Sequence, residues 1–523
     1  MKKLSLWITG LGFALNACAQ QNPAAVKYSK IITADDAKKH LSILASDEYE
    51  GRETGKPGAE KAANYLAAEL KKLGLQAPVA GSYFLNVPLT ESSVNVTAFN
   101  INGQAFGNWK DFFFQGAYPD KKVFATDVVF VGYGTAAELA AADLTGKVVL
   151  WINEDKPEEG KTPNTSYRMT AARQEILKGI IAKNPAIVLA ANDGVTTLLK
   201  RFNGVSPGGA RISIKKETKT VTTAPIFNIS TAVADAAVKS TGKTFTDLKT
   251  AAKTATETQT LKTTADIGIA TQSKDVKAVD VLGFMPGSDA KLKEEVLVFS
   301  AHYDHVGLNP KPDAKDKVFN GADDDGSGTT GVLEIARAFA QAKKDGKGPK
   351  RSVLFLFNVG EEKGLLGSEW YTDHPVYPLA NTIADLNIDM IGRVGEEYAT
   401  NPDSANYVYS IGSAMLSSDL HKISEEANNT YTKMKLDYKY DDPNDPNRFY
   451  YRSDHYNFAR FDVPIIFYFN GVHADYHGLG DEVSKINFPL LAKRAQLAFF
   501  TGWELANRAT RPVVDKKAAP GTR

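Results

Sequence analysis

The sequence has little cysteine and no long hydrophobic run after its first residues. One cysteine, Cys18, occurs in 523 residues, which excludes an internal disulfide framework and any metal site built from several thiolates. No later apolar run approaches the roughly 20 residues that a membrane-spanning helix needs. The sequence also lacks an excess of one charge, with 62 Lys and Arg against 61 Asp and Glu. We therefore expect no nucleic-acid partner.

The overall composition is that of a folded protein. Hydrophobic residues make up 43% and charged residues 24% of the chain, which are ordinary globular values and exclude a wholly disordered, collagen-like or coiled-coil protein. At about 150 residues per domain, the length gives room for roughly three domains.

Residues 1–18 have the pattern of a targeting segment. Lys2 and Lys3 precede an apolar stretch, 4–15, that is too short to span a bilayer and is typical of a secretory signal. The following Leu15-Asn16-Ala17-Cys18 resembles the bacterial lipoprotein signal, in which the cysteine is acylated after cleavage. We expect an exported protein, lipid-anchored at Cys18 in the periplasm or at the outer membrane or cell surface. The alternative is a plain signal peptide that contains a cysteine.

The rest of the chain divides by its patterns. Apolar residues recur at helical spacing over 57–73, and short strands are expected at 128–131, 148–152 and 187–191. We interpret 115–260 as an inserted domain, 19–114 and 261–510 as the two parts of a main domain, and 511–523 as a disordered tail. After residue 280, apolar runs at 296–299, 353–357, 383–390 and 465–469 alternate with helical patterns. Such alternation predicts an α/β fold whose mixed, mostly parallel sheet is covered on both faces.

Histidines and carboxylates follow four of these predicted strands. They are His302 and Asp304, then Glu361 and Glu362, then Asp389, and finally His473 and His477, while Asp323, Asp324 and Asp325 lie between the first two strands. Ligands of open α/β sheets bind outside the carboxyl ends of the strands, and such groups are costly to bury unless they are paired or bind metal. Histidine and carboxylate without thiolate suit zinc, with manganese or cobalt as alternatives. Five candidate ligands are enough for two ions that share one carboxylate.

Several strings that contain these residues resemble the bacterial di-zinc aminopeptidase family, the co-catalytic zinc exopeptidases related to transferrin-receptor-like peptidases. They are His302-Tyr-Asp304, Gly321-Ala-Asp-Asp-Asp-Gly-Ser-Gly328, Glu361-Glu362-Lys-Gly, Asn387-Ile-Asp389, Ser453-Asp-His455 and Tyr476-His477, together with Ser46-Asp47-Glu-Tyr-Glu-Gly51-Arg52. The stretch Asp143-Leu-Thr-Gly146-Lys-Val-Val-Leu150 resembles the protease-associated domain that many members carry. The resemblance implies a three-layer α/β sandwich with an inserted smaller α/β protease-associated domain.

The same resemblance assigns roles to individual residues. It implies two Zn²⁺ ions held by His302, Asp324, Glu362, Asp389 and His477, with Asp324 bridging the ions. It makes Glu361 the general base and Asp304 the residue that orients His302. It also implies a cis peptide bond between Asp324 and Asp325.

The neighbouring residues receive more modest interpretations. We expect structural roles for His305 and His473, and contact with a ligand rather than with metal for His455. Tyr450 is equally well explained as a hydrogen-bond donor to a developing oxyanion and as a packed aromatic residue.

The implied function is removal of N-terminal residues from peptide substrates. Two other enzymes on the same fold, a carboxypeptidase and a glutaminyl cyclase, stay open as alternatives. A non-catalytic, receptor-like binding protein is less favoured, because relatives of that kind lose ligands and every expected ligand is present here. Beyond the anchor at Cys18 no membrane association is expected, and no pattern indicates an oligomeric state.

Overall fold

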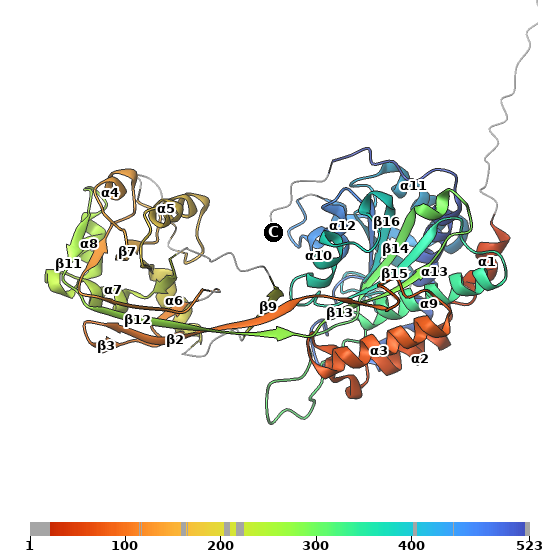
Figure 1. Ribbon diagram of the computed structural model, residues 1–523, viewed down its shortest axis with the longest axis horizontal. Helices are drawn as coiled ribbons and strands as arrows, with labels where there is room; N and C mark the ends of the chain where they lie inside the picture. The colour runs from red at the N-terminus through yellow and green to blue at the C-terminus, as the bar shows by residue number, and fades with distance from the viewer. Residues whose placement is uncertain are drawn as a thin grey trace, which may run out of the picture. The chain divides into compact units, whose positions relative to one another are not determined.

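The computed structural model describes residues 21–517 except 115, 117, 158–163, 165, 203–209, 216–223, 401–404 and 443. The predicted targeting segment, with Cys18, and the last six residues lie outside this part. The chain forms two units (Figure 1): the main unit, Met1–Pro88 with Lys277–Arg523, and the inserted unit, Leu89–Val276.

The main unit is built on an eight-stranded mixed sheet with the strand order β1-β13-β15-β14-β16-β19-β17-β18. The strands are β1 (Phe84–Asn86), β13 (Val279–Met285), β14 (Val296–His302), β15 (Ser352–Asn358), β16 (Thr382–Ile388), β17 (Tyr407–Ile411), β18 (Lys435–Asp437) and β19 (Ile465–Phe469). The four central strands, β15, β14, β16 and β19, are parallel to one another. Their carboxyl ends therefore lie at one edge of the sheet.

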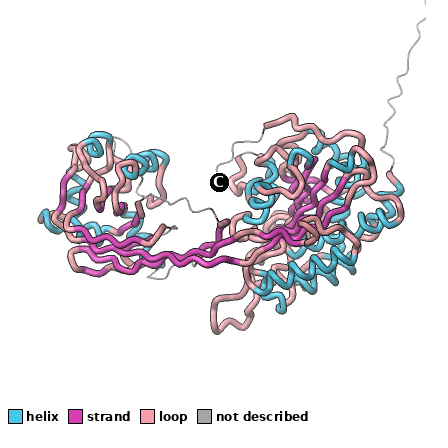
Figure 2. Tube along the Cα trace, in the orientation of Figure 1, coloured by secondary structure: helices cyan, strands magenta, loops and turns pink. Residues whose placement is uncertain are grey.

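Helices cover both faces of this sheet (Figure 2). They are α1 (Pro23–Ser29), α2 (Ala34–Leu44), α3 (Pro57–Lys72), α9 (Gly326–Lys344), α10 (Leu366–Asp373), α11 (Ser418–Ala427), α12 (His455–Ala459) and α13 (Phe488–Asn507). Val298 and Phe299 are successive residues of β14 and so point to opposite faces. Val298 belongs to a buried cluster with Tyr371 of α10 and Phe458 of α12, whereas Phe299 packs against Phe339 of α9. The expected α/β sandwich is confirmed.

The inserted unit is also α/β. One sheet has the order β11-β6-β7-β8-β10-β4 and the other the order β3-β2-β12-β5, with β9 beside β2. Its strands are β2 (Leu89–Ile101), β3 (Gln104–Ala105), β4 (Phe112–Phe114), β5 (Lys121–Ala125), β6 (Val128–Phe130), β7 (Val148–Ile152), β8 (Ile187–Ala191), β9 (Arg211–Ile214), β10 (Ile226–Ile229), β11 (Gln259–Leu261) and β12 (Ala265–Val276). Its helices are α4 (Ala136–Ala140), α5 (Ala171–Ile181), α6 (Asp193–Phe202), α7 (Thr231–Val238) and α8 (Phe245–Ala251).

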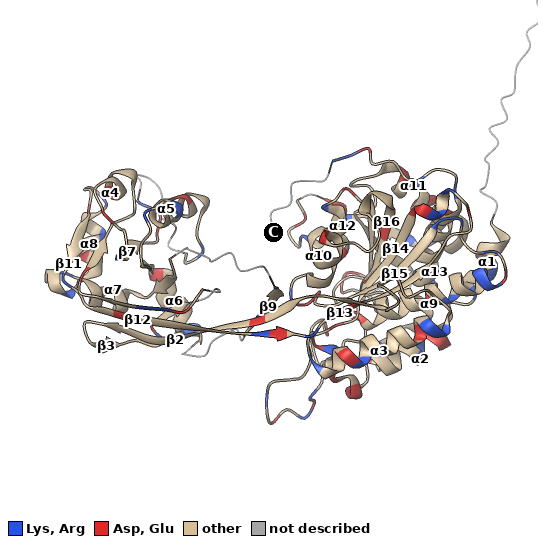
Figure 3. Ribbon diagram, in the orientation of Figure 1, with Lys and Arg blue, Asp and Glu red and all other residues tan. Residues whose placement is uncertain are grey.

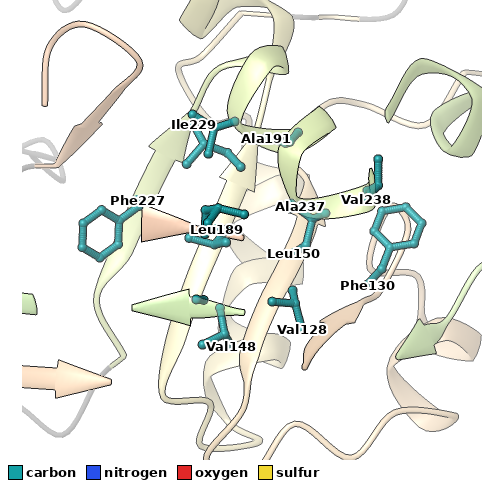
Figure 4. Packing of buried hydrophobic residues seen from close by; sticks show 14 of the residues in the cluster. Val128, Phe130, Val148, Leu150, Leu189, Ala191, Phe227, Ile229, Ala237 and Val238 are labelled. Atoms are coloured by element: carbon teal, nitrogen blue, oxygen red, sulfur yellow. The ribbon is translucent and has the colours of Figure 1, made fainter. Parts of the chain in front are cut away.

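The core of the inserted unit is made by its parallel strands. Figure 4 shows Val148 and Leu150 of β7 and Leu189 of β8 in one cluster with Ala237 and Val238 of α7. This separate core accounts for the compactness of the unit. That the unit is a protease-associated domain stays a prediction.

The inserted unit extends beyond the expected 115–260 at both ends. Strands β2 and β12 pair antiparallel from Leu89 opposite Val276 to Ile101 opposite Ala265. This pairing joins segments far apart in the sequence, and the stretch Thr-Glu-Ser-Ser in β2 lacks an alternating apolar pattern. The local sequence pattern therefore does not indicate where the inserted unit begins and ends.

The start of the expected disordered tail is ordered against the main unit, which corrects that expectation. Arg511 donates hydrogen bonds to the carbonyls of Ala380 and Thr382, and the N–H of Lys516 donates to the carbonyl of Leu416. Figure 3 shows Lys and Arg interspersed with Asp and Glu on both units. Within the described residues, no helix is both long enough and apolar enough to cross a membrane.

Candidate metal centre

The ends of the central strands deliver the candidate ligands. His302 is the last residue of β14, and Asp389 directly follows β16. Glu361 and Glu362 lie in the turn after β15, and His477 lies in the loop after β19. Asp324 precedes α9, which begins at Gly326. The structure therefore places all five predicted ligands and the predicted base at one edge of the sheet.

The two carboxylate oxygens of Asp324 face two different histidines. Asp324 Oδ1 lies 3.4 Å from His302 Nε2, and Asp324 Oδ2 lies 3.0 Å from His477 Nε2. His302 Nε2 is also 3.6 Å from Asp389 Oδ2, and His477 Nε2 is 3.2 Å from Glu362 Oε2. The Oδ1 side of Asp324 thus has one histidine and one further carboxylate. The Oδ2 side has His477 and Glu362, and His305 Nδ1 also lies 3.9 Å from this oxygen. That these five residues bind metal stays a prediction.

The centre has an excess of negative charge and is buried except at His477, whose side chain is 40% exposed. His302, Asp324 and Asp389 are all less than one-tenth exposed, and no Lys or Arg in the described residues forms an ion pair with Asp324, Glu362 or Asp389. Burial disfavours a charged His302, but the Glu361 and Asp389 carboxylates outweigh burial and raise its pKa. Asp324 and Glu362 likewise outweigh burial and raise the pKa of His477 to about 10. These buried carboxylates need compensating positive charge, and the donor set suits zinc.

Asp304 contacts both the predicted ligand and the predicted base. His302 Nδ1 lies 3.1 Å from the Asp304 main-chain carbonyl and 3.8 Å from its carboxylate. The carboxylate instead accepts hydrogen bonds from the Glu361 N–H at 3.2 Å and the Thr54 hydroxyl at 2.6 Å. Asp304 therefore positions the segment that carries Glu361 as well as His302. Thr54 is not among the residues predicted from the sequence, although it adjoins the Gly51-Arg52 motif.

The loop of Asp324 is held by two other aspartates. Asp325 Oδ2 accepts a hydrogen bond from the His302 N–H, and its Oδ1 accepts from the Met390 N–H. Asp325 lies close enough to His302 and Asp389 to share a metal ion with them, but these main-chain donors already use its oxygens. Asp481 accepts hydrogen bonds from the N–H groups of Asp323 and Asp324 at 3.0 Å. The Asp324–Asp325 peptide bond is cis, as expected.

Asp481 is not among the residues predicted from the sequence. Its only local signal is its place in a glycine-rich loop directly after His477.

Three further histidines take contacts that differ from one another. His305 Nδ1 lies 2.9 Å from Glu362 Oε1, so His305 contacts a predicted ligand directly. His473 Nε2 lies 3.2 Å from Asp323 Oδ2. His455 hydrogen-bonds to the Tyr450 carbonyl, while its neighbour Ser453 donates to Asp389 Oδ2 at 2.6 Å. The contact expected for His455 is thus made by Ser453.

A tyrosine other than Tyr450 lies against the ligands. The buried Tyr450 ring packs on Tyr451 and Tyr456, which favours the packed-aromatic interpretation. Tyr476 stacks on His477 with ring centroids 4.0 Å apart, and its hydroxyl accepts a hydrogen bond from Arg452 at 3.2 Å. Burial raises the pKa of Tyr476, and the Asp324 carboxylate adds to this shift.

Comparison with known proteins finds one matching family model and partial sequence matches to aminopeptidases. Residues 280–501 match the family model described as Peptidase family M28. Aminopeptidase YwaD of Bacillus subtilis is 33% identical over 121 residues, covering 22% of this chain and 23% of that protein. A probable leucine aminopeptidase of Trichophyton verrucosum is 28% identical over 219 residues, covering 41% of this chain and 55% of that protein. The chain thus spans less than two thirds of the length of these relatives.

The fold has a counterpart among solved structures. The aminopeptidase from Aneurinibacillus sp. strain AM-1 superposes with a TM-score of 0.53 at 18% sequence identity, over 95% of this chain and 100% of that chain. At this identity the likeness concerns the fold.

Proposed function

We propose that the protein is a zinc-dependent aminopeptidase of peptidase family M28, whose family model matches residues 280–501. The observation that carries the proposal is the position of Asp324 between two histidine–carboxylate pairs, His302 with Asp389 and His477 with Glu362. Relatives that match part of the chain are named aminopeptidases. We propose that the site holds two Zn²⁺ ions, which His302, Asp324, Glu362, Asp389 and His477 would bind, with Asp324 shared between them.

In this proposal the zinc ligands and Glu361 have separate roles in the reaction. Bound zinc would polarise the scissile carbonyl and make a water molecule more acidic. The Glu361 carboxylate, 3.9 Å from His302 Nε2, takes the proton of the attacking water and returns it to the leaving amine. The Glu361 N–H bond to Asp304 fixes the main chain that carries this base.

Two further groups face the substrate in this proposal. The Tyr476 hydroxyl, held by Arg452, donates a hydrogen bond to the oxyanion that develops on the carbonyl. Asp389 and Glu361 supply negative charge for the free amine of the substrate. This charge supports an aminopeptidase over a carboxypeptidase, which must instead bind a carboxylate.

The direct test uses amino-acid p-nitroanilides beside the same compounds with a blocked amine. We expect release of nitroaniline from the free-amine substrates only, its loss with a chelator and its recovery with added zinc. Release of C-terminal residues from peptides would favour the carboxypeptidase. Cyclisation of N-terminal glutamine without hydrolysis would favour the glutaminyl cyclase. No turnover in any zinc-loaded assay would contradict the proposal.

A further inference from the structure

A chain of buried polar side chains runs from the interior of the sheet to the metal centre. It begins at Asp385 of β16, passes through Ser300 of β14, Asn387 of β16 and Ser453, and ends at Asp389. The successive contacts are Ser300 Oγ to Asp385 Oδ1 at 2.7 Å, Ser300 Oγ to Asn387 Oδ1 at 2.9 Å, Asn387 Nδ2 to Ser453 Oγ at 2.9 Å and Ser453 Oγ to Asp389 Oδ2 at 2.6 Å. The first four residues are at most 1% exposed, so water does not compete for these contacts.

The geometry follows from the sheet register. Ser300 and Asn387 are direct partners across the β14–β16 pair. Asp385 is two residues before Asn387 in the same strand and therefore points to the same face. Polar residues at these positions of a central strand form a stripe beneath the ligands, on the face covered by α10 and α12.

The hydrogen-bond chain lacks one hydrogen if the carboxylates at both of its ends, Asp385 and Asp389, are ionised. Four contacts need four hydrogens. Ser300 and Ser453 contribute one each, and the Asn387 amide contributes one, because only one of its two ends carries N–H groups. Exchanging the amide oxygen and nitrogen moves the shortage from Ser300 to Ser453 but does not remove it. The fourth hydrogen must therefore be on one of the two carboxyl groups.

Of the two carboxyl groups at the ends of the hydrogen-bond chain, only that of Asp385 can keep a proton. Asp389 lies beside His302 and, as a metal ligand, must be deprotonated. Asp385 is fully buried, and its Oδ2 has no hydrogen-bond partner within the described residues. The other titratable groups that influence it are on α10 and at the start of α12, Tyr371 and Asp454. Neither supplies positive charge, and burial raises the pKa of Asp385 well above its ordinary value.

We propose that Asp385 is a neutral carboxylic acid and a positioning residue, the far end of a hydrogen-bond chain that orients the Asp389 carboxylate. In this arrangement Asp385 donates to Ser300, Ser300 donates to Asn387, Asn387 donates to Ser453 and Ser453 donates to Asp389. All donors point toward the metal centre, and hydrogen bonds aligned in this way strengthen one another. The proposal rests on the proposed function only in taking Asp389 as an ionised ligand.

The protonation state has a direct spectroscopic test. The infrared difference spectrum between wild type and Asp385→Asn, recorded on zinc-loaded protein at pH 9, should contain a carbonyl band of a protonated carboxyl group that shifts in D₂O. Asp454→Asn is the matched control, because Asp454 is equally buried and lies outside this hydrogen-bond chain, and burial raises its pKa only to about 7. The infrared difference spectrum between wild type and Asp454→Asn should contain no such band at pH 9. Absence of the band from the Asp385→Asn difference would overturn the neutral acid.

The positioning role has a second test. Asp385→Asn keeps a neutral donor toward Ser300, so its zinc affinity and kcat should stay close to wild type. Asp385→Ala removes the donor and should lower zinc affinity or kcat about 10- to 100-fold, as loss of an outer partner of a metal ligand does. An Ala variant that folds and binds zinc like wild type would overturn the positioning role. If the wild type lacks peptidase activity but shows the infrared band, the proposed function fails while the neutral acid stands.

Discussion

At the scale of single residues, Glu361 is the proposed general base, and its substitution tests that role. Glu361→Gln keeps the size of the side chain but removes its capacity to accept a proton. We expect kcat to fall by roughly 10²- to 10⁴-fold, the usual scale for loss of a general base. The zinc content should be unchanged, because Glu361 is not among the five proposed ligands.

The matched control is the neighbouring Glu362→Gln. Since Glu362 lies 3.2 Å from His477 Nε2, this variant should lose zinc as well as activity. Steady-state kinetics and elemental analysis of both variants separate the two roles. A Glu361→Gln enzyme within a factor of about two of wild type would mean that another group is the base.

Site residues that lie in short local motifs were predictable from the sequence, whereas contacts between distant segments were not. His302, Glu361 and Asp389 follow strands that an apolar run identifies, so their convergence was predictable. The bond from Thr54 to Asp304 joins residues 250 positions apart, and the bonds from Asp323 and Asp324 to Asp481 join residues 158 and 157 positions apart. Nothing local to Thr54 or Asp481 indicates those partners.

At the scale of elements, Arg52 connects the N-terminal segment to the loops of the metal centre. The buried guanidinium donates to the carbonyls of Leu44, Tyr303, Asn320 and Gly321 at 2.7 to 2.8 Å. Lysine has a single ammonium group and cannot reproduce this planar fork. Since hydrogen bonds from charged donors contribute about 1.5–3 kcal/mol each, Arg52→Lys should lower the free energy of unfolding by at least about 2 kcal/mol and weaken zinc binding.

Urea unfolding and a zinc competition assay check this prediction. Lys71→Arg, at an exposed position of α3, is the control and should change neither quantity. An Arg52→Lys protein as stable as wild type would show that these four carbonyls need no guanidinium.

Helix α9 carries a buried acid whose titration should affect stability. Burial outweighs the contact with Arg337 and raises the pKa of Glu334 from 4.5 to about 7. The folded state therefore binds this proton more tightly than the unfolded state, and the resulting stabilisation is present below pH 4.5 and lost as the pH rises through 7. A shift of this size corresponds to about 3 kcal/mol.

The measurement compares wild type with Glu334→Gln, which cannot ionise, by urea unfolding between pH 4.5 and 8. Relative to the Gln variant, wild type should lose stability across that range. A difference that is independent of pH would show that the pKa of Glu334 is not raised.

Elements with strong apolar patterns were predictable, and those defined by pairing were not. The runs at 296–299 and 353–357 correspond to β14 and β15, and the helical spacing at 57–73 corresponds to α3. The long pair of β2 and β12 has mixed polar faces, and its pairing is long-range. It was absent from the sequence-based expectation for that reason.

At the scale of the whole molecule, we propose export and a lipid anchor at Cys18, from the sequence of residues 1–18 alone. Metabolic labelling with a radioactive fatty acid should mark the wild-type protein, and fractionation should place it with membranes. Cys18→Ser should abolish the label and release the protein from membranes. A labelled Ser variant, or a wild type without label, would contradict acylation at this residue.

Two divalent cations that share the Asp324 carboxylate are the central element of the proposed function. Anomalous diffraction at the zinc absorption edge, from crystals of the zinc-loaded protein, locates those ions without reference to activity. We predict two peaks about 3.5–4 Å apart, one beside His302 and Asp389 and the other beside His477 and Glu362. A single peak, or peaks away from Asp324, would contradict a shared pair of zinc ions.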